Sequence, residues 1–290
     1  MFNSGLRKEA QRDLEVAVEN YEKKVETRQK KLEELYNSRT QLKKQLQYAI
    51  EYIDGLANKP VGINADMKEV KIQYTRFENL LIAAKKQYDE DLKAAGGTVA
   101  GGVAAGVGVA ALAPTAAMAI ATTFGTASTG VAISTLSGAA ATNAALAWLG
   151  GGAIAAGGSG MVGGSALLAA AGPIGWTIGG AALIGGGLLA NGKNKKASEQ
   201  MRKQTVEVKA AEKGENTLIY ETDRVINLTN GDSDYIRSGL QVFTTSYPNN
   251  AREFSNEQWQ NIMAFVHNMK ASAKSLNWVL GEDRKFHAQD

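Results

Sequence analysis

A 99-residue stretch without a charged side chain begins AAGGTVAGGVAAGVGVAALAP (residues 94–114) and ends GPIGWTIGGAALIGGGLLANG (172–192). Gly and Ala together occupy 55 of its positions, while all charged residues of the 290-residue chain lie outside it. A helix in water normally carries charge on its outer face. This stretch, which we call the apolar block, has no such face, so protein or lipid must cover it.

Gly-rich and Gly-Pro breaks divide the apolar block into pieces at 98–123, 131–149, 153–171 and 174–190. Each piece has about the length needed to cross the ~30 Å hydrocarbon layer of a bilayer, which is near 20 residues. An even number of crossings leaves both flanks on one side. Lysines border the block at Lys93 and Lys193, which fits a cytoplasmic or starting side for both ends.

The insertion signal of each piece is nevertheless weak. A Leu or Ile contributes roughly −0.3 to −0.6 kcal/mol to insertion, whereas Ala and Gly add little. Each piece therefore lies near the threshold between solution and membrane, as expected of a protein that first stays soluble and then inserts. The side chains predicted to insert are Val99, Val103, Val107, Leu112, Ile120, Ile133, Leu146, Trp148, Ile154, Leu167, Leu168, Ile174, Trp176, Ile178, Leu183 and Leu188.

Small residues allow helices to approach closely, and Gly-x-x-x-Gly pairs recur in the block. With so many glycines, several such pairs also arise by chance. The glycines predicted to form helix–helix contacts are Gly97, Gly101, Gly102, Gly106, Gly160, Gly164, Gly175 and Gly179.

The flanks of the block have the opposite character and predict an all-α fold, an elongated bundle of long amphipathic helices with the block as an apolar helical insertion. Apolar residues recur at steps of three, four or seven over 5–58, 63–92 and 259–280. These seams predict an intramolecular core, with an intermolecular coiled coil as the alternative. The chain thus divides into a coiled-coil region at 1–93, the block at 94–192, and a helical region at 193–290 that completes the bundle.

Local signals predict where these helices begin and end. Asp66 with Glu69, and Ser255 with Gln258, resemble capping boxes. Asn230-Gly231 predicts the end of the helix that starts at Lys193, followed by a short helix from Ser233 to about Thr245. No alternating strand pattern is visible in the flanks, and His287 is expected in a mobile tail.

Composition argues against an enzyme and against several binding functions. The absence of Cys excludes disulfides, thiolate zinc sites and Cys nucleophiles, and the two histidines, His267 and His287, are too few and too far apart for a metal cluster. Stretches 158–163 and 187–194 approach nucleotide-binding motifs but lack the required acidic residue and Ser/Thr, respectively. The net charge of +3 arises from interspersed charges, which predicts no nucleic-acid patch. We therefore expect no catalytic residues, cofactor or metal.

No secretory signal peptide is visible at the start of the sequence, since Met1 to Arg12 lack a continuous apolar core. This predicts a protein that is cytoplasmic while soluble and reaches a membrane later. Export by a signal-independent route is the alternative.

The order of charged helices, apolar insertion and charged helices resembles the α-helical pore-forming toxins of the cytolysin A and haemolysin BL type, although this block is longer and richer in Gly. The resemblance implies a bacterial protein whose insertion, at 94–192, is sheltered by the bundle and released into a membrane as protomers assemble. The expected partners are a lipid membrane, further copies of the chain and a possible second subunit. The setting would be a secreted toxin or an effector that kills its own cell in antiphage defence.

Two other functions fit the same sequence. One is a constitutive membrane protein with four spans and a cytoplasmic coiled-coil scaffold. The other is a soluble structural or adaptor protein whose Gly/Ala block forms a closely packed helical core.

Overall fold

The computed structural model describes residues 4–59, 61–94, 193–280 and 283–288. Its helices are α1 (Ser4–Gly55), α2 (Asn64–Ala94), α7 (Lys193–Ser246) and α8 (Asn256–Ser275), with short 3₁₀ turns η1 (Val61–Ile63) and η5 (Ala251–Glu253). Strands β1 (Val279–Leu280) and β2 (Phe286–His287) form an antiparallel hairpin. The all-α prediction is confirmed. The hairpin was not predicted, because two-residue strands leave no alternating pattern in a sequence.

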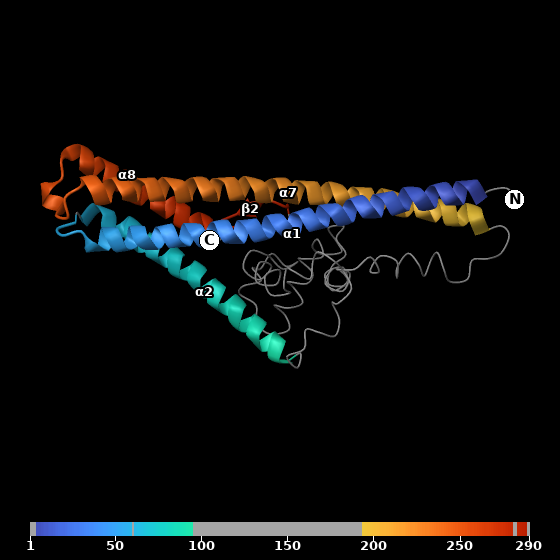
Figure 1. The fold of residues 1–290 in the computed structure, drawn as a ribbon, viewed down its shortest axis with the longest axis horizontal. Helices are drawn as coiled ribbons and strands as arrows, with labels where there is room; N and C mark the ends of the chain where they lie inside the picture. Colours follow the sequence, from blue (N-terminus) through green and yellow to red (C-terminus); the bar gives the residue numbers. More distant parts are fainter. Residues whose placement is uncertain (1–3, 60, 95–192, 281–282, 289–290) are drawn as a thin grey trace.

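Helices α1 and α7 lie side by side and run in the same direction (Figure 1). Arg28 of α1 contacts Glu215 of α7, and just beyond the ends of the two helices Ala57 forms a parallel bridge with Asn250, so the numbers of the paired residues rise together. At 1.5 Å per residue the two helices are about 80 Å long. Each then turns at the same end of the molecule and returns as α2 or α8. The described part, which we call the frame, is thus two helical hairpins laid next to each other.

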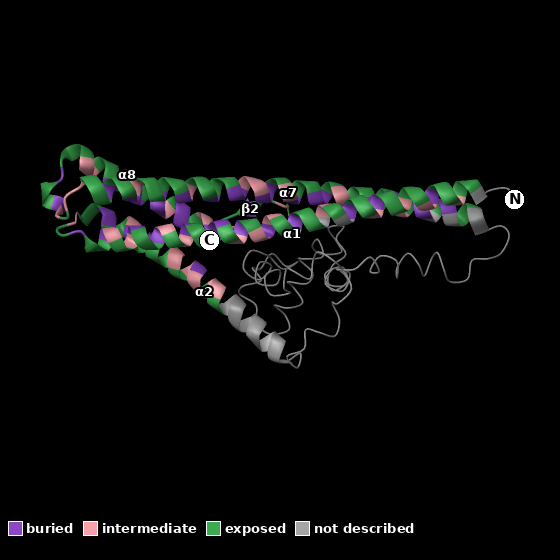
Figure 2. Cartoon of the chain, viewed as in Figure 1, coloured by how far each residue is buried: buried purple, intermediate pink, exposed green. Residues whose placement is uncertain are grey.

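The buried residues of α1 lie on the face that points toward α7 (Figure 2), and they have the spacing of a coiled coil. Ala10, Ala17 and Ser38 are buried in α1, and steps of three, four or seven residues separate its larger buried side chains, which are Tyr21, Arg28, Leu32, Leu35, Arg39, Leu42, Leu46, Ala49, Ile53 and Leu56. This seam packs on α7 within the same chain. Two arginines therefore occupy positions that the repeat reserves for apolar residues.

The facing seam of α7 contains buried threonines that satisfy their own hydroxyl groups. Thr222 donates to the Leu218 carbonyl at 2.7 Å, and Thr229 donates to the Val225 carbonyl at 2.8 Å. A threonine that bonds to the carbonyl four residues earlier needs no partner on the neighbouring helix. These positions can face α1 without leaving a buried polar group unsatisfied.

Helix α7 is continuous through Asn230-Gly231, so the predicted helix end there is wrong. The local glycine signal is overridden by tertiary packing, because the buried face continues on both sides of it, through Thr229 and Ser233 to Ile236. Gly231 itself lies on the exposed face with nothing within 4 Å of the position a Cβ would take.

Gly231→Ala is therefore expected to stabilise the protein by about 0.5–1 kcal/mol, because alanine restricts the unfolded chain and suits a helix interior. Urea unfolding followed by circular dichroism would measure this gain. Gly239→Ala is the contrasting variant, since its Cβ would lie 2.6 Å from the Phe265 ring, and it should be neutral or destabilising. A loss of stability in Gly231→Ala would mean that the helix ends there after all.

The start of α8 follows the sequence prediction. Gln258 N–H donates to Ser255 Oγ at 3.2 Å, and Ser255 N–H donates to Gln258 Oε1 at 2.9 Å, which completes the capping box. The predicted box at Asp66 and Glu69 is wrong, because α2 begins earlier, at Asn64. Asp66 instead contacts α8, and Glu69 accepts a hydrogen bond from Gln73.

Aromatic side chains pack together in the core at the end of the frame that holds the two turns. Phe243 packs edge-on against Tyr247 and Phe265, and Phe254 packs against Tyr247 and Trp259. Helix α2 packs mainly on α8 and diverges from α1 along its length (Figure 1). The frame is therefore most compact at the turns and opens toward the end of α2.

Candidate functional site: the apolar block and its attachment to the frame

The residues predicted to insert into a membrane, from Val99 to Leu188, lie outside the described residues, as do the predicted contact glycines from Gly97 to Gly179. The same holds for Gly158–Gly163 and for the greater part of 187–194, the two motifs that approach nucleotide-binding sequences. Among the described helices, none has an apolar stretch long enough to cross a membrane.

The frame shows where the apolar block joins it. Helix α2 ends at Ala94 after returning for 31 residues, about 46 Å, from the turn end of the frame. Helix α7 begins at Lys193, close to the start of α1 at the other end (Figure 1). Because α1 and α7 are parallel, the chain must cross the remaining length of the frame between these points. The block is therefore also the crossover between the two helical hairpins.

A buried ion pair lies in the α1–α7 interface. Arg28 Nε is 3.1 Å from Glu215 Oε2, and the two side chains are only 5% and 4% exposed. Tyr21 lies seven residues before Arg28, on the same face of α1. Burial and the nearby charge of Glu215 raise the pKa of the Tyr21 hydroxyl group. A buried pair of this kind favours one register of two helices, because any slip separates the charges.

A second buried arginine joins α1 to the C-terminal segment. Arg39 is fully buried, and its Nη2 donates to the Trp278 carbonyl at 3.0 Å. Its guanidinium carbon lies 5.6 Å from the centroid of the Phe286 ring. Burial lowers the pKa of Arg39 to about 9, so the group still carries its charge at neutral pH. This single side chain connects α1 with both ends of the β1–β2 hairpin.

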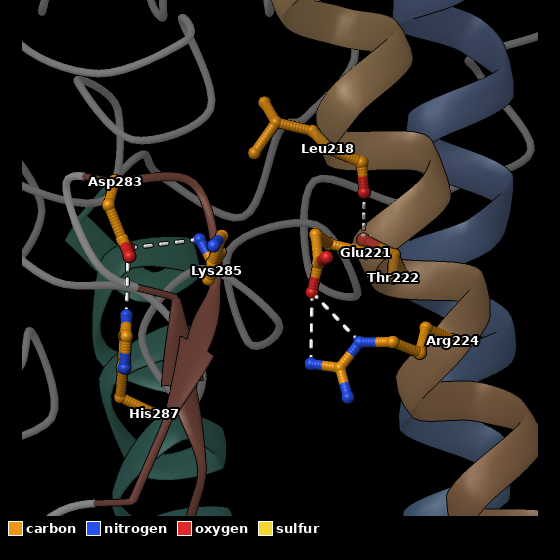
Figure 3. A network of polar contacts seen from close by, with 7 residues as sticks. All are labelled: Leu218, Glu221, Thr222, Arg224, Asp283, Lys285 and His287. Carbon is orange, nitrogen blue, oxygen red and sulfur yellow. Dashed lines mark hydrogen bonds and ion pairs between the residues drawn. The ribbon is translucent and has the colours of Figure 1, made fainter.

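The β1–β2 hairpin is also held by contacts of its turn (Figure 3). Asp283 accepts hydrogen bonds from the Lys285 backbone N–H at 3.1 Å and contacts His287 Nε2 at 2.8 Å. The hydrogen bond with His287 lowers the pKa of the Asp283 carboxyl group. His287 is thus part of a strand, and its expected place in a mobile tail is wrong.

The turn of the hairpin reaches α7. Arg284 has a positive φ of 62° and lies so close to Gly214 that a side chain there would collide with its guanidinium. Because Arg39 contacts the hairpin from α1 and Arg284 contacts Gly214 of α7, the hairpin packs against both helices of the parallel pair.

Farther along α7, Glu221 accepts two hydrogen bonds from Arg224, at 3.0 Å and 2.9 Å, as Figure 3 shows.

A third polar contact joins α2 to α8. Asp66 accepts a hydrogen bond from Lys270, and His267 Nδ1 lies 3.4 Å from its other oxygen. The bond from Lys270 is the main cause of a lowered pKa at Asp66, and His267 adds to it. His267 is otherwise exposed. This contact ties the first turn of α2, the helix that leads into the block, to the rest of the frame.

The lowered pKa of Asp66 predicts a pH dependence. The ionised group stabilises the fold above its ordinary pKa of 3.8, and this stabilisation is lost as pH falls through the lower folded-state value. Asp66→Asn should therefore cost about 0.5–1 kcal/mol at pH 7, the range of surface ion pairs, and less near pH 2. Urea unfolding at both pH values would measure this. Asp13→Asn, at an exposed position of α1, should show neither effect; equal losses at both pH values would contradict the assignment.

Among the described residues, no three His, Asp or Glu side chains come together as a metal site. Searches of family models, curated proteins and solved structures find no match to the chain.

The buried polar contacts of the frame were not predicted, although a signal for two of them is present in the sequence. Arg28 and Arg39 fall on the three-four spacing of the α1 seam, between apolar neighbours such as Leu35 and Leu42. A charged residue at such a position indicates a buried partner. The partner of Arg28, Glu215, is almost 190 residues away, and local periodicity could not have identified it.

Proposed function

We propose that this chain is a non-enzymatic membrane-active protein that converts from a soluble helical bundle into a membrane-inserted oligomeric pore or lesion. The observation that carries the proposal is the 99-residue charge-free block placed between two amphipathic helical hairpins. Charge-free helical segments of about 20 residues are suited to hydrocarbon, and their high Gly and Ala content keeps insertion marginal. Marginal insertion permits a soluble state before the membrane state.

The organisation of the frame supports this conversion. Its main core is made by side chains of α1, α2, α7, α8 and the turns between them, from Leu32 in α1 to Phe286 in the hairpin. A block that leaves for a membrane would therefore not take these core side chains with it. The proposed conversion keeps the frame folded and moves the block.

Leakage from vesicles tests the proposal. Full-length protein is mixed with dye-filled liposomes, with and without mild acid, and size-exclusion profiles are recorded before and after lipid is added. We expect dye release and a shift to a larger, lipid-associated species. No dye release under any of these conditions would overturn the proposed pore or lesion, whether or not the protein associates with lipid.

The same experiment separates the two alternatives. A constitutive membrane protein would not be recovered without detergent, and an adaptor protein would remain a stable soluble particle in the presence of lipid. Recovery of a soluble species that associates with vesicles is expected only for the proposed function.

A further inference from the structure

An open groove of about 900 Å³ lies between the end of α1 and the first half of α2. Its lining includes three lysines, Lys59, Lys68 and Lys71, and one acidic side chain, Asp54, and these four residues together carry two net positive charges. Asp54 is already paired with Lys71 at 2.7 Å and with Lys59 at 3.4 Å. Asp54 offsets one of the three lysine charges, so the lysines of the groove retain a cationic surplus.

Exposed apolar side chains accompany this charge. Val61, in the η1 turn beside the groove, is 83% exposed. On α2, Ile72 lines the groove and is 49% exposed, and Ile82 is 60% exposed three turns further along the helix. Lys68 and Ile72 fall on the face of α2 that points away from its buried seam at Met67, Val70 and Phe77. Cationic and apolar side chains on one outer helix face are typical of helices that lie in a membrane interface.

The position of the groove relates it to the apolar block. The same helix, α2, carries the groove near its start and ends at Ala94, where the block begins. From Asn79, the last groove residue, to Ala94 is about 22 Å of helix. A bilayer bound along this face of α2 would therefore bring the start of the block to the membrane surface.

We infer that the α1–α2 groove is the docking site for the headgroups of anionic phospholipids. Phosphate groups match the cationic surplus of the groove, and Val61 and Ile72 supply apolar contact with the acyl boundary. This inference rests on the proposed function, because it assigns the frame the first contact with the membrane that the block later enters.

Vesicle flotation of the full-length chain tests the groove. Wild type is compared on equimolar phosphatidylcholine–phosphatidylglycerol vesicles and on phosphatidylcholine alone, with dye release recorded in the same samples. The groove variant is Lys68→Glu with Lys71→Gln, and the control variant, Lys203→Glu with Lys209→Gln, makes the same charge change at exposed positions of α7. Val61→Asp tests the apolar contact separately.

We expect wild type to prefer the anionic vesicles and the groove variant to bind them roughly tenfold to hundredfold more weakly, because each lysine near an anionic surface contributes about fivefold. The control should bind like wild type, and Val61→Asp should bind more weakly than wild type. Equal losses in groove and control variants would overturn the inference, as would groove-dependent binding of inorganic phosphate without groove-dependent binding of vesicles.

The two readouts separate failure of the groove from failure of the proposed function. Dye release that is insensitive to the groove variants would overturn the groove and leave the membrane function standing. Groove-dependent flotation without dye release would support the docking site and overturn the pore or lesion.

Discussion

Leu183→Asp and Leu112→Asp should each lower dye release from vesicles by about two to three orders of magnitude. Both leucines lie near the middle of a predicted membrane-crossing piece, 174–190 for Leu183 and 98–123 for Leu112. An Asp at the centre of a membrane helix costs roughly 3 kcal/mol, and the lost Leu contribution adds to this. A total of 3–4 kcal/mol corresponds to about 10²–10³ in the population of the inserted state.

The control for these variants is Val206→Asp, which adds the same charge at a position of α7 that is 68% exposed. It should release dye like wild type. Size-exclusion chromatography and circular dichroism of all three variants before lipid is added would establish that the soluble fold is retained. Wild-type leakage from properly folded Leu183→Asp and Leu112→Asp would contradict a membrane role for the block.

Glu215→Gln is expected to destabilise the frame by about 3–5 kcal/mol, because it leaves the buried Arg28 charge without its counter-charge. The double variant Arg28→Leu with Glu215→Leu removes both charges and should recover most of this loss, since apolar pairs can replace buried ion pairs at little cost. Chemical unfolding measures both. The double variant separates the lost counter-charge from any general sensitivity of this interface.

Glu207→Gln, at an exposed position of α7, is the matched control and should change stability by less than about 0.5 kcal/mol. A loss of similar size in Glu215→Gln would mean that Arg28 and Glu215 are not buried against each other. That outcome would contradict the register in which α1 and α7 are paired.

The limits of the apolar block could be predicted from the sequence, whereas the pairing of Arg28 with Glu215 could not. The limits of the block follow from charge alone, because lysines border a stretch that has none. The seam of α1 was recognised from its spacing, but the partner of Arg28 was not. A heptad pattern states which residues face a neighbouring helix and leaves the identity of that helix open.

Helix-end signals that span only one turn predicted the structure correctly in one case and wrongly in two, because contacts with distant parts of the chain can override them. Ser255 and Gln258 form the predicted capping box, because both of its hydrogen bonds are made within four residues. Asn230-Gly231 did not end α7. A glycine destabilises a helix by only about 1 kcal/mol, and burial of the side chains on either side of Gly231 stabilises the helix by more than that. Asp66 does not form the predicted capping box, because it accepts a hydrogen bond from Lys270, which is more than 200 residues away in the sequence.

The helical class, the charge-free block and the apolar seams are properties of composition and spacing, and they can be read without knowing any contact. The direction of α7 relative to α1 is different, since an apolar repeat presents the same stripe to a parallel and to an antiparallel partner. Only long-range pairings such as Arg28 with Glu215 and Ala57 with Asn250 distinguish the two. The parallel arrangement, and with it the role of the block as the crossover between two helical hairpins, therefore emerges only when the chain packs on itself.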